Sequence, residues 1–472
     1  KQKTVNLTWQ FQDEKLERVM ALAGLKQPIS GTAAGRIQLR GTLPKPSASG
    51  MVNIISGRVS KQEFARGSFF FQSQGDGLLL ERASLEQNGS RLAAQGTIGT
   101  DGSLNLKIIA PRLNLASLTF IPQEQQTLLA GEVSFQGLVG GTLSRPEVIG
   151  ELASAKLEYD DYVFENLAGR IKYAAGSVDL EAFKLQWLGA ELVATGRMRE
   201  MKNPELDLQL QITGIPLNQA VALAGWKDGQ KILGGHLDGM AQLAGPVGAL
   251  KGEGFFSLRG GKIGKLPLGG RGELVFSQGE LQLQAVSLTQ GKGTISAAGR
   301  ITSSGMSLKV EGQELDLALI SQLTGEKIPD LAGRFSLQAE IAGDYAGPKI
   351  SAQLAAQNAK LGELKLGQID ARLQLNEGIV TVEKLQTRQN GGFLSLTGTL
   401  PLSFSEAKAF GMAKAAKAGS RTDLKLELNG IDLRLLAALN PNLKTLSGIV
   451  SAQLQLRGEI GKPELYGRVD VQ

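Results

Sequence analysis

Residues 446–467 read Leu-Ser-Gly-Ile-Val-Ser-Ala-Gln-Leu-Gln-Leu-Arg-Gly-Glu-Ile-Gly-Lys-Pro-Glu-Leu-Tyr-Gly. This stretch is the fifth copy of a pattern: a glycine, a second glycine ten residues on, a proline five further on, and a small residue four after that. The earlier copies begin at Gly31, Gly131, Gly235 and Gly333, and the third has Leu250 in place of the proline. The starting glycines are separated by 131−31 = 100, 235−131 = 104, 333−235 = 98 and 448−333 = 115 residues. A unit of about 100 residues is therefore repeated along the chain.

Glycine also recurs at three later places in the unit. Recurrence at one position predicts backbone that turns tightly or takes a positive φ. These glycines are, in order along the unit, Gly77, Gly176, Gly279 and Gly378; Gly89, Gly189, Gly291 and Gly391; and Gly96, Gly196, Gly299 and Gly398.

The spacing predicts an elongated array of repeats in which each unit contacts mainly its neighbours. We expect a partial preceding repeat with a short helix over residues 1–30, then repeats over residues 31–130, 131–234, 235–332 and 333–447, and a partial fifth repeat over residues 448–472. An Ala/Lys-rich insert at residues 403–422 lengthens the fourth repeat. We interpret this insert as a solvated loop with some helical tendency; the alternative is a basic helix that touches lipid headgroups. A chain that begins Lys-Gln-Lys and stops within a repeat is expected to be part of a longer protein.

Composition limits the possible function. The 472 residues include 61 glycines, 5% aromatic residues and 42% hydrophobic residues, which is typical of many short strands over an aliphatic interior. The net charge of +6 is spread along the chain, and aromatic side chains for base stacking are few, so nucleic-acid binding is not expected. With no cysteine, disulfides and thiolate metal sites are excluded, and a periplasmic location is compatible. No apolar run approaches the length of a membrane span, and the segment does not begin with a signal peptide.

Apolar and polar residues alternate with a period of two, which predicts strands with one aliphatic face and one hydrated face. We expect about seven strands per unit, each 5–9 residues long, in an all-β fold with a short helix at each repeat junction. The predicted helices cover residues 13–24, 114–120, 217–224, 315–323 and 432–439. The predicted aliphatic face consists of Ile37, Leu39, Leu104, Leu106, Ile108, Leu206, Leu208, Leu210, Ile212, Leu281, Leu283, Leu373, Leu375, Leu424, Leu426, Leu428, Leu454 and Leu456.

No combination of residues indicates catalysis, a cofactor or a metal. The single histidine, His236, has no second histidine for a zinc site and is expected on the surface of a strand. Glycines 269, 270 and 272 do not form a dinucleotide fingerprint and are interpreted as a turn. The acidic residues at 158, 160, 161 and 165 are interpreted as a solvated turn and not as a calcium or acid/base site. Trp9, Trp187 and Trp226 occupy unrelated repeat positions and are expected to be packing residues.

A sheet with one aliphatic face must cover that face. Two arrangements are open at this point. The face closes into a dry core, which makes the protein a passive spacer, or it stays open as a groove that takes acyl chains.

The Leu-x-Gly start, the alternating strand, the Gly-x4-Pro-x3-Gly block and the following Asp/Asn-Leu helix resemble the TamB family of the AsmA-like superfamily. Examples are residues 331–348, 446–467 and 315–317. The resemblance covers nearly the whole chain, and its motifs specify the style of repeat. It implies a U-shaped β-taco groove in a periplasmic protein of two-membraned bacteria, anchored in the inner membrane through a segment outside this one. It also implies phospholipids as cargo and an Omp85-type outer-membrane barrel as a partner. The family's anchor helix and C-terminal domain are expected to be absent or incomplete here.

We therefore expect a non-enzymatic conduit that carries phospholipid acyl chains along a continuous groove between the two membranes. The second hypothesis is a periplasmic scaffold or chaperone that presents strand edges during the assembly of outer-membrane β-barrel proteins. A third hypothesis, a β-helix enzyme acting on polysaccharide, is disfavoured because no acidic cluster has a base or metal partner within the same pattern. Which lipid is carried, and what drives it, is not encoded in these patterns.

Overall fold

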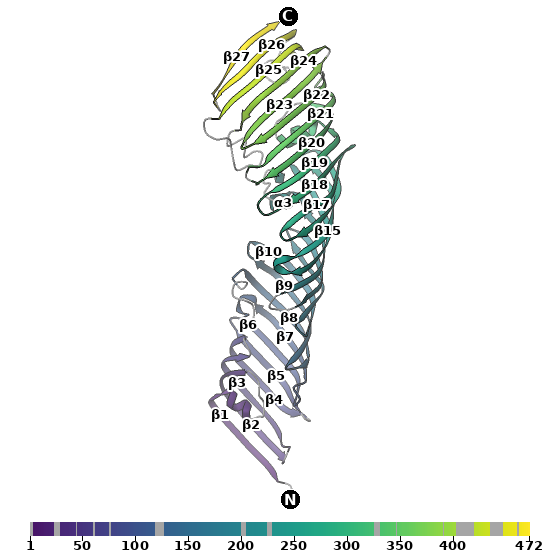
Figure 1. The fold of residues 1–472 in the computed structure, drawn as a ribbon. Helices are drawn as coiled ribbons and strands as arrows, with labels where there is room; N and C mark the ends of the chain where they lie inside the picture. Colours follow the sequence, from purple (N-terminus) through teal and green to yellow (C-terminus); the bar gives the residue numbers. More distant parts are fainter. Residues whose placement is uncertain are drawn as a thin grey trace. The chain divides into compact units, whose positions relative to one another are not determined.

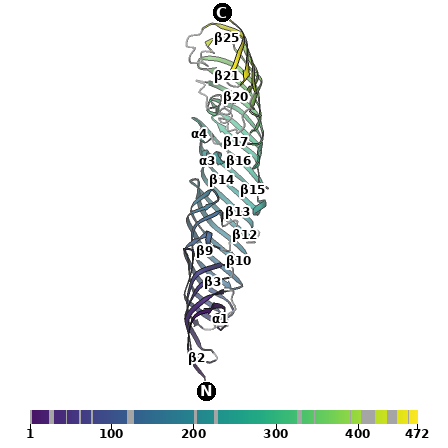
Figure 2. The ribbon, with the colours of Figure 1, turned by 90° about the vertical axis from the view of Figure 1, so that its left-hand side faces the viewer.

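The computed structural model describes residues 3–22, 29–43, 45–59, 62–74, 77–118, 127–199, 204–223, 229–324, 331–345, 347–389, 391–402, 420–434, 447–459 and 462–472. These residues form strands joined by short turns and a few short helices (Figures 1 and 2), so the predicted all-β class is confirmed. The chain divides into two compact units. Unit 1 comprises Lys1–Gln211 and Ala244–Val247, and unit 2 comprises Ile212–Leu243 and Gly248–Gln472.

Twelve strands belong to unit 1. They are β1 (Thr4–Lys15), β2 (Ile29–Thr42), β3 (Ser47–Val59), β4 (Gln62–Gln74), β5 (Gly77–Gln87), β6 (Ser90–Gly99), β7 (Leu104–Asn114), β8 (Leu129–Thr142), β9 (Arg145–Tyr159), β10 (Tyr162–Ala174), β11 (Ser177–Trp187) and β12 (Ala190–Arg199). Each strand pairs antiparallel with the next one in sequence, which gives a simple meander.

Unit 2 contains a second meander of the same kind. Its strands are β15 (Lys251–Ile263), β16 (Leu266–Ser277), β17 (Glu280–Gln290), β18 (Gly293–Ile301), β19 (Met306–Asp316), β20 (Leu331–Gly343), β21 (Lys349–Leu361), β22 (Leu364–Asn376), β23 (Ile379–Gln389), β24 (Gly392–Pro401), β25 (Arg421–Asp432), β26 (Ile449–Glu459) and β27 (Lys462–Val471). Consecutive strands again pair antiparallel. Strands β13 (Glu205–Pro216) and β14 (Leu233–Pro246) contribute residues to both units.

The helices are short and lie where repeat junctions were predicted. They are α1 (Leu16–Leu22), η1 (Leu115–Ser117), α3 (Leu217–Leu223), α4 (Gly229–Ile232) and α5 (Ala318–Thr324), with η2 (Val247–Ala249) in a turn. Four of the five predicted junction helices are therefore found, although α1 and α5 begin three residues later than expected because the preceding strand continues further. The fifth, at residues 432–439, lies mostly outside the described residues, as do most of the 403–422 insert and Trp226.

The repeat is built differently in detail from the expected one. The glycines that start the copies lie in β2, β8, β14 and β20 or directly before β26, so six described strands separate one start from the next, and the predicted number of seven is wrong. The strands are also longer than predicted, from 9 residues in β18 to 15 in β9. Positive-φ residues such as Ala182 and Glu314 lie inside strands, where the register shifts, and do not end them. Glycines 269, 270 and 272 also lie inside a strand, β16, so the prediction that they form a turn is wrong.

The recurring glycine near the end of each unit has a physical explanation. Gly299 has a φ of +140°, and a Cβ added there would lie 2.1 Å from the carbonyl oxygen of Ser307 on the next strand. Gly398 has the same problem, with a φ of +126° and a distance of 1.9 Å to the carbonyl oxygen of Asp423. A side chain is excluded at this position because the neighbouring strand approaches too closely.

The strand ends define two margins in each sheet. We call the ends that carry α1, η1 and α5 the helix margin, and the opposite ends, where strands are joined only by turns or by residues 403–420, the turn margin. Buried residues collect at the helix margin. In unit 1, Leu16 and Val19 of α1 pack on Phe11, Ile54 and Phe64 (α1 is visible at the purple end in Figure 2). None of the described helices is long and apolar enough to cross a membrane.

Candidate functional site

All eighteen predicted aliphatic residues lie in strands, and each is buried or partly buried. Leu428 is buried, with 4% of its surface exposed, and the other seventeen are partly buried. Their sequence neighbours point the other way: Asn105 and Lys107 in β7, and Asp207 and Gln209 in β13, are exposed. The prediction of one aliphatic and one hydrated face therefore agrees with the burial pattern, and we call the first of these the apolar face.

The strand register joins these residues into rows that run across neighbouring strands. In unit 2, Leu426 stands opposite Leu454 on one side and Leu396 on the other. The whole row from β18 to β26 is Ile295, Gly312, Leu337, Leu354, Ala371, Leu385, Leu396, Leu426 and Leu454. The adjacent row is Ala297, Val310, Ala339, Ala352, Leu373, Val382, Gly398, Leu424 and Leu456. No charged or amide side chain interrupts either row.

Unit 1 has an equivalent row of its own. It begins with Trp9, whose ring lies 4.5 Å from that of Phe11, and continues over all twelve strands. Its members are Trp9, Ile37, Gly50, Phe71, Leu80, Gly96, Leu106, Val139, Val148, Tyr173, Val178 and Met198. Cross-strand neighbours of this kind lie about 5 Å apart, so the apolar contact is continuous within the unit.

Sequence reasoning missed many members of these rows, because small residues interrupt the alternation in single strands. Ala339 and Ala352 pair directly with each other, and Gly398 pairs with Leu424. The repeat alignment carries the missing signal, since Gly398 recurs at the same place in every full unit.

The apolar face is not covered evenly. At the helix margin of unit 2, Leu315, Leu317 and Ile263 form a buried cluster, and Leu361, Ile431 and Val450 form a second one. Away from this margin most members of the rows stay partly buried; Gly312 and Val382 are the buried ones. Leu402, which follows β24 and lies outside the rows, is buried against Leu375 and Val380. The apolar face therefore has a margin packed by the chain itself and a middle whose side chains still contact solvent.

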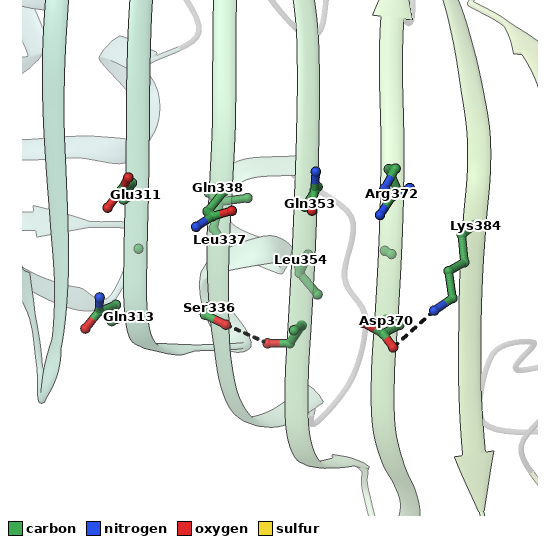
Figure 3. Close-up of a pocket in the computed structure, with 13 residues that line it drawn as sticks. Glu311, Gln313, Ser336, Leu337, Gln338, Gln353, Leu354, Asp370, Arg372 and Lys384 are labelled. Atoms are coloured by element: carbon green, nitrogen blue, oxygen red, sulfur yellow. Dashed lines mark hydrogen bonds and ion pairs between the residues drawn. The ribbon is translucent and has the colours of Figure 1, made fainter.

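The opposite face carries the charges. A hollow of about 320 Å³ lies over β19 to β23 (Figure 3), and its side chains include Glu311, Gln353, Asp370, Arg372 and Lys384. The Lys384 ammonium pairs with Asp370 at 3.2 Å. This ion pair is exposed to solvent and links the neighbouring strands β22 and β23.

The polar residues singled out from the sequence lie on the surface or in turns. No group of three or more His, Cys, Asp or Glu residues in the described part of the chain could hold a metal ion. His236 is exposed in β14, and Asp160 and Asp161 form the turn between β9 and β10, both as predicted. Trp187 packs edge-on against Tyr162, which agrees with the predicted packing role. The shifted pKa values have ordinary partners: the Arg259 guanidinium lowers the pKa of Asp238, and Arg197 lowers that of Asp179.

Residues 284–472 match the family model of the TamB C-terminal domain. These residues belong to the TamB family. The match begins inside β17 and runs to the last residue, so it covers most of unit 2. Of the two expectations for the C-terminal domain, absent or incomplete, the match therefore excludes complete absence. No curated protein matches the chain. The TamB family comprises periplasmic proteins of transport and assembly that associate with membranes and with TamA-type partners.

Proposed function

We propose that this chain is a segment of a periplasmic lipid conduit, in which phospholipid acyl chains lie along the apolar face and headgroups stay in water at the open side. The supporting observation is the combination of unbroken apolar rows with incomplete burial. A face of this length that was meant as a dry core would be expected to be packed along the whole of each strand. Acyl chains supply the missing contact, at about 0.8 kcal/mol for each CH₂ group removed from water.

Uniform rows also provide a mechanism for movement. Leu373, Leu424 and Leu456 lie in one row with no hydrogen-bonding group that would fix a lipid at one place. A tail that moves by one strand exchanges one set of aliphatic contacts for a similar set, so the barrier between positions is low. No catalytic residue or cofactor is required. In this proposal the protein is anchored in the inner membrane outside the present segment, and the cargo moves between the two membranes.

The test places a charge in the rows. Leu283→Asp, Leu375→Asp or Leu208→Asp in the full-length protein should block lipid delivery, because burying an unpaired carboxylate in a tail-filled face is costly. The matched controls are Gln282→Asp and Gln374→Asp, which put the same charge on the neighbouring exposed position. Lipid delivery to the outer membrane and strand content are measured together. Delivery that survives all three apolar-face changes rules the conduit out.

A photo-crosslinking residue at Leu375 tests the identity of the occupant. Phospholipid adducts, identified by mass spectrometry, are expected. If the adducts are instead polypeptides of outer-membrane β-barrel proteins, the chain acts as the scaffold that was the second hypothesis.

A further inference from the structure

One turn of the turn margin carries an exposed, large apolar side chain in each of the four full repeats. The residues are Leu43 (48% exposed), Leu143 (41%), Val247 (55%) and Tyr345 (38%). Each stands twelve residues after the starting glycine of its copy, in the turn that ends β2, β8, β14 or β20. We call these four the lip residues. Single exposed apolar residues are common on protein surfaces, but four at one repeat position require a reason.

The other turns of the same margin are different. The turns at residues 175–176, 278–279 and 377–378 read Ala-Gly, Gln-Gly and Glu-Gly. The turns at residues 100–103 and 302–305 read Thr-Asp-Gly-Ser and Thr-Ser-Ser-Gly. None of these five described turns carries a large apolar side chain, so a general tolerance for them at this margin does not explain the pattern.

Hydrogen bonds hold the lip residues in place. The amide of Leu43 donates to the carbonyl of Lys3 at 2.9 Å, and the amide of Leu143 donates to that of Gly102 at 2.9 Å. In unit 2, the Tyr345 hydroxyl donates to the carbonyl of Thr302 at 2.6 Å. Each of these turns is thus tied to a neighbouring strand end, so its apolar side chain is held at the edge of the sheet.

The lip residues continue the period of the apolar face. Val139, Gly141 and Leu143 stand two apart in sequence, and so do Ile341, Gly343 and Tyr345. Val139 and Ile341 belong to the apolar face, where they pair with Val148 and Ile350. The intervening glycines Gly141 and Gly343 have positive φ values of +73° and +99°, so the backbone turns between the last row of the face and the exposed side chain.

We propose that the lip residues are contact points for the acyl chains of phospholipid where a tail crosses the edge of the apolar face. This inference rests on the proposed conduit and adds the place where tails pass between the face and the water-exposed side. Lipid fits better than a protein partner because the lip residues are isolated. Leu43 and Leu143 are six strands apart, about 29 Å along a sheet with ~4.8 Å between strands, and a protein interface needs a contiguous patch.

The experiment places a photo-crosslinking residue at Leu143, at Tyr345, at Leu375 and at Gln278 of the full-length protein in cells. Gln278 is the control, since it is an exposed residue of another turn at the same margin. Phospholipid adducts are expected at 143, 345 and 375, with at least about fivefold less at 278. If lipid adducts form at 375 but are no more abundant at 143 and 345 than at 278, the role proposed for the lip residues is wrong and the proposed conduit is still supported. Absence of lipid at all four positions overturns both, and polypeptide adducts at the lip overturn the assignment in favour of a protein partner.

A second measurement does not depend on crosslinking. Leu43→Ser, Leu143→Ser, Val247→Ser and Tyr345→Ser combined should slow lipid delivery several-fold while circular dichroism keeps its strand signal, because all four side chains are exposed. Unchanged delivery overturns the assignment.

Discussion

The middle and the helix margin of a single strand use the same residue types in different ways. In β19, Leu308 and Val310 are partly buried, whereas Leu315 at the helix margin is fully buried. In β25, Leu424 is partly buried and Ile431 is fully buried. Aliphatic side chains at the margin are covered by the chain, and those in the middle are not. Hydrophobicity alone therefore does not distinguish a residue that stabilises the fold from one that is available to a ligand.

The margin is covered because each repeat folds back on itself there. In unit 2, Ile263 at the end of β15 packs with Leu317 and Leu319, which follow β19 four strands later. In unit 1, the side-chain amide of Gln62 donates to the carbonyl of Ser117 at 3.3 Å. Such contacts connect strands that are not neighbours, and they stabilise the helix margin without filling the middle.

The largest expected effect tests this division directly. Leu315→Ala should cost about 2–5 kcal/mol of local stability, because it leaves a cavity in a packed cluster. Leu308→Ala, its partner in the same strand, should cost less than half of that, because its side chain already contacts solvent. Hydrogen exchange of the β19 and β20 amides measures both. Equal losses would mean that the middle is as well packed as the margin.

The next effect concerns how closely neighbouring strands approach each other. Gly299 lies near the turn-margin end of β18, opposite Leu283 and Leu308. Gly299→Ala should cost roughly 2–3 kcal/mol, since the residue has a positive φ and its Cβ would collide with the Ser307 carbonyl. Gly291→Ala is the control, because Gly291 has a φ of +60° and open space around it, and about 1 kcal/mol is expected there. Thermal unfolding compares the two. A loss at Gly291 that matches the one at Gly299 would show that backbone strain, and not strand approach, fixes the glycine.

Much of the fold could be predicted because the repeat marks its own geometry. Gly96, Gly196 and their counterparts indicated special backbone, and a period of two indicated strands with one apolar face. Strand length could not be predicted in this way. A positive-φ residue such as Ala182 is expected in a turn, yet hydrogen bonds to both neighbours keep the strand going past it. Local sequence does not contain that cross-strand information.

The candidate site was predictable in part for a similar reason. Leu424 and Leu428 have the same alternation in sequence, so the pattern places both on one face, but only the folded-back margin determines that Leu428 is buried. The lip residues were detectable from sequence, since Leu143 and Tyr345 share a repeat position. They were missed because a single exposed leucine in a turn does not indicate a function. The pattern becomes visible only when the copies of the repeat are aligned.

The smallest expected effect concerns an ion pair on the charged face. Such pairs contribute little to the difference in packing between the helix margin and the middle of the strands. Asp238 accepts hydrogen bonds from Arg259 at 2.8 and 3.0 Å and from the Gly214 amide at 2.8 Å. The guanidinium is the main reason that the pKa of Asp238 lies below its usual value. A lowered pKa in the folded state means that the stabilisation is present above the unfolded value of about 3.9 and is lost as the pH falls through the folded value.

Asp238→Asn should therefore abolish the acid-dependent part of the protection of the Gly214 amide, and it should change protection at neutral pH by less than about fivefold, as is usual for pairs near the surface. Arg259→Lys is the matched variant, because it keeps the charge and loses the two-pronged geometry. It should retain part of the acid dependence. The measurement is hydrogen exchange between pH 3 and 7. A change in protection that spreads to the Leu315 cluster would contradict the comparison, since it would mean that the polar face holds the margin closed.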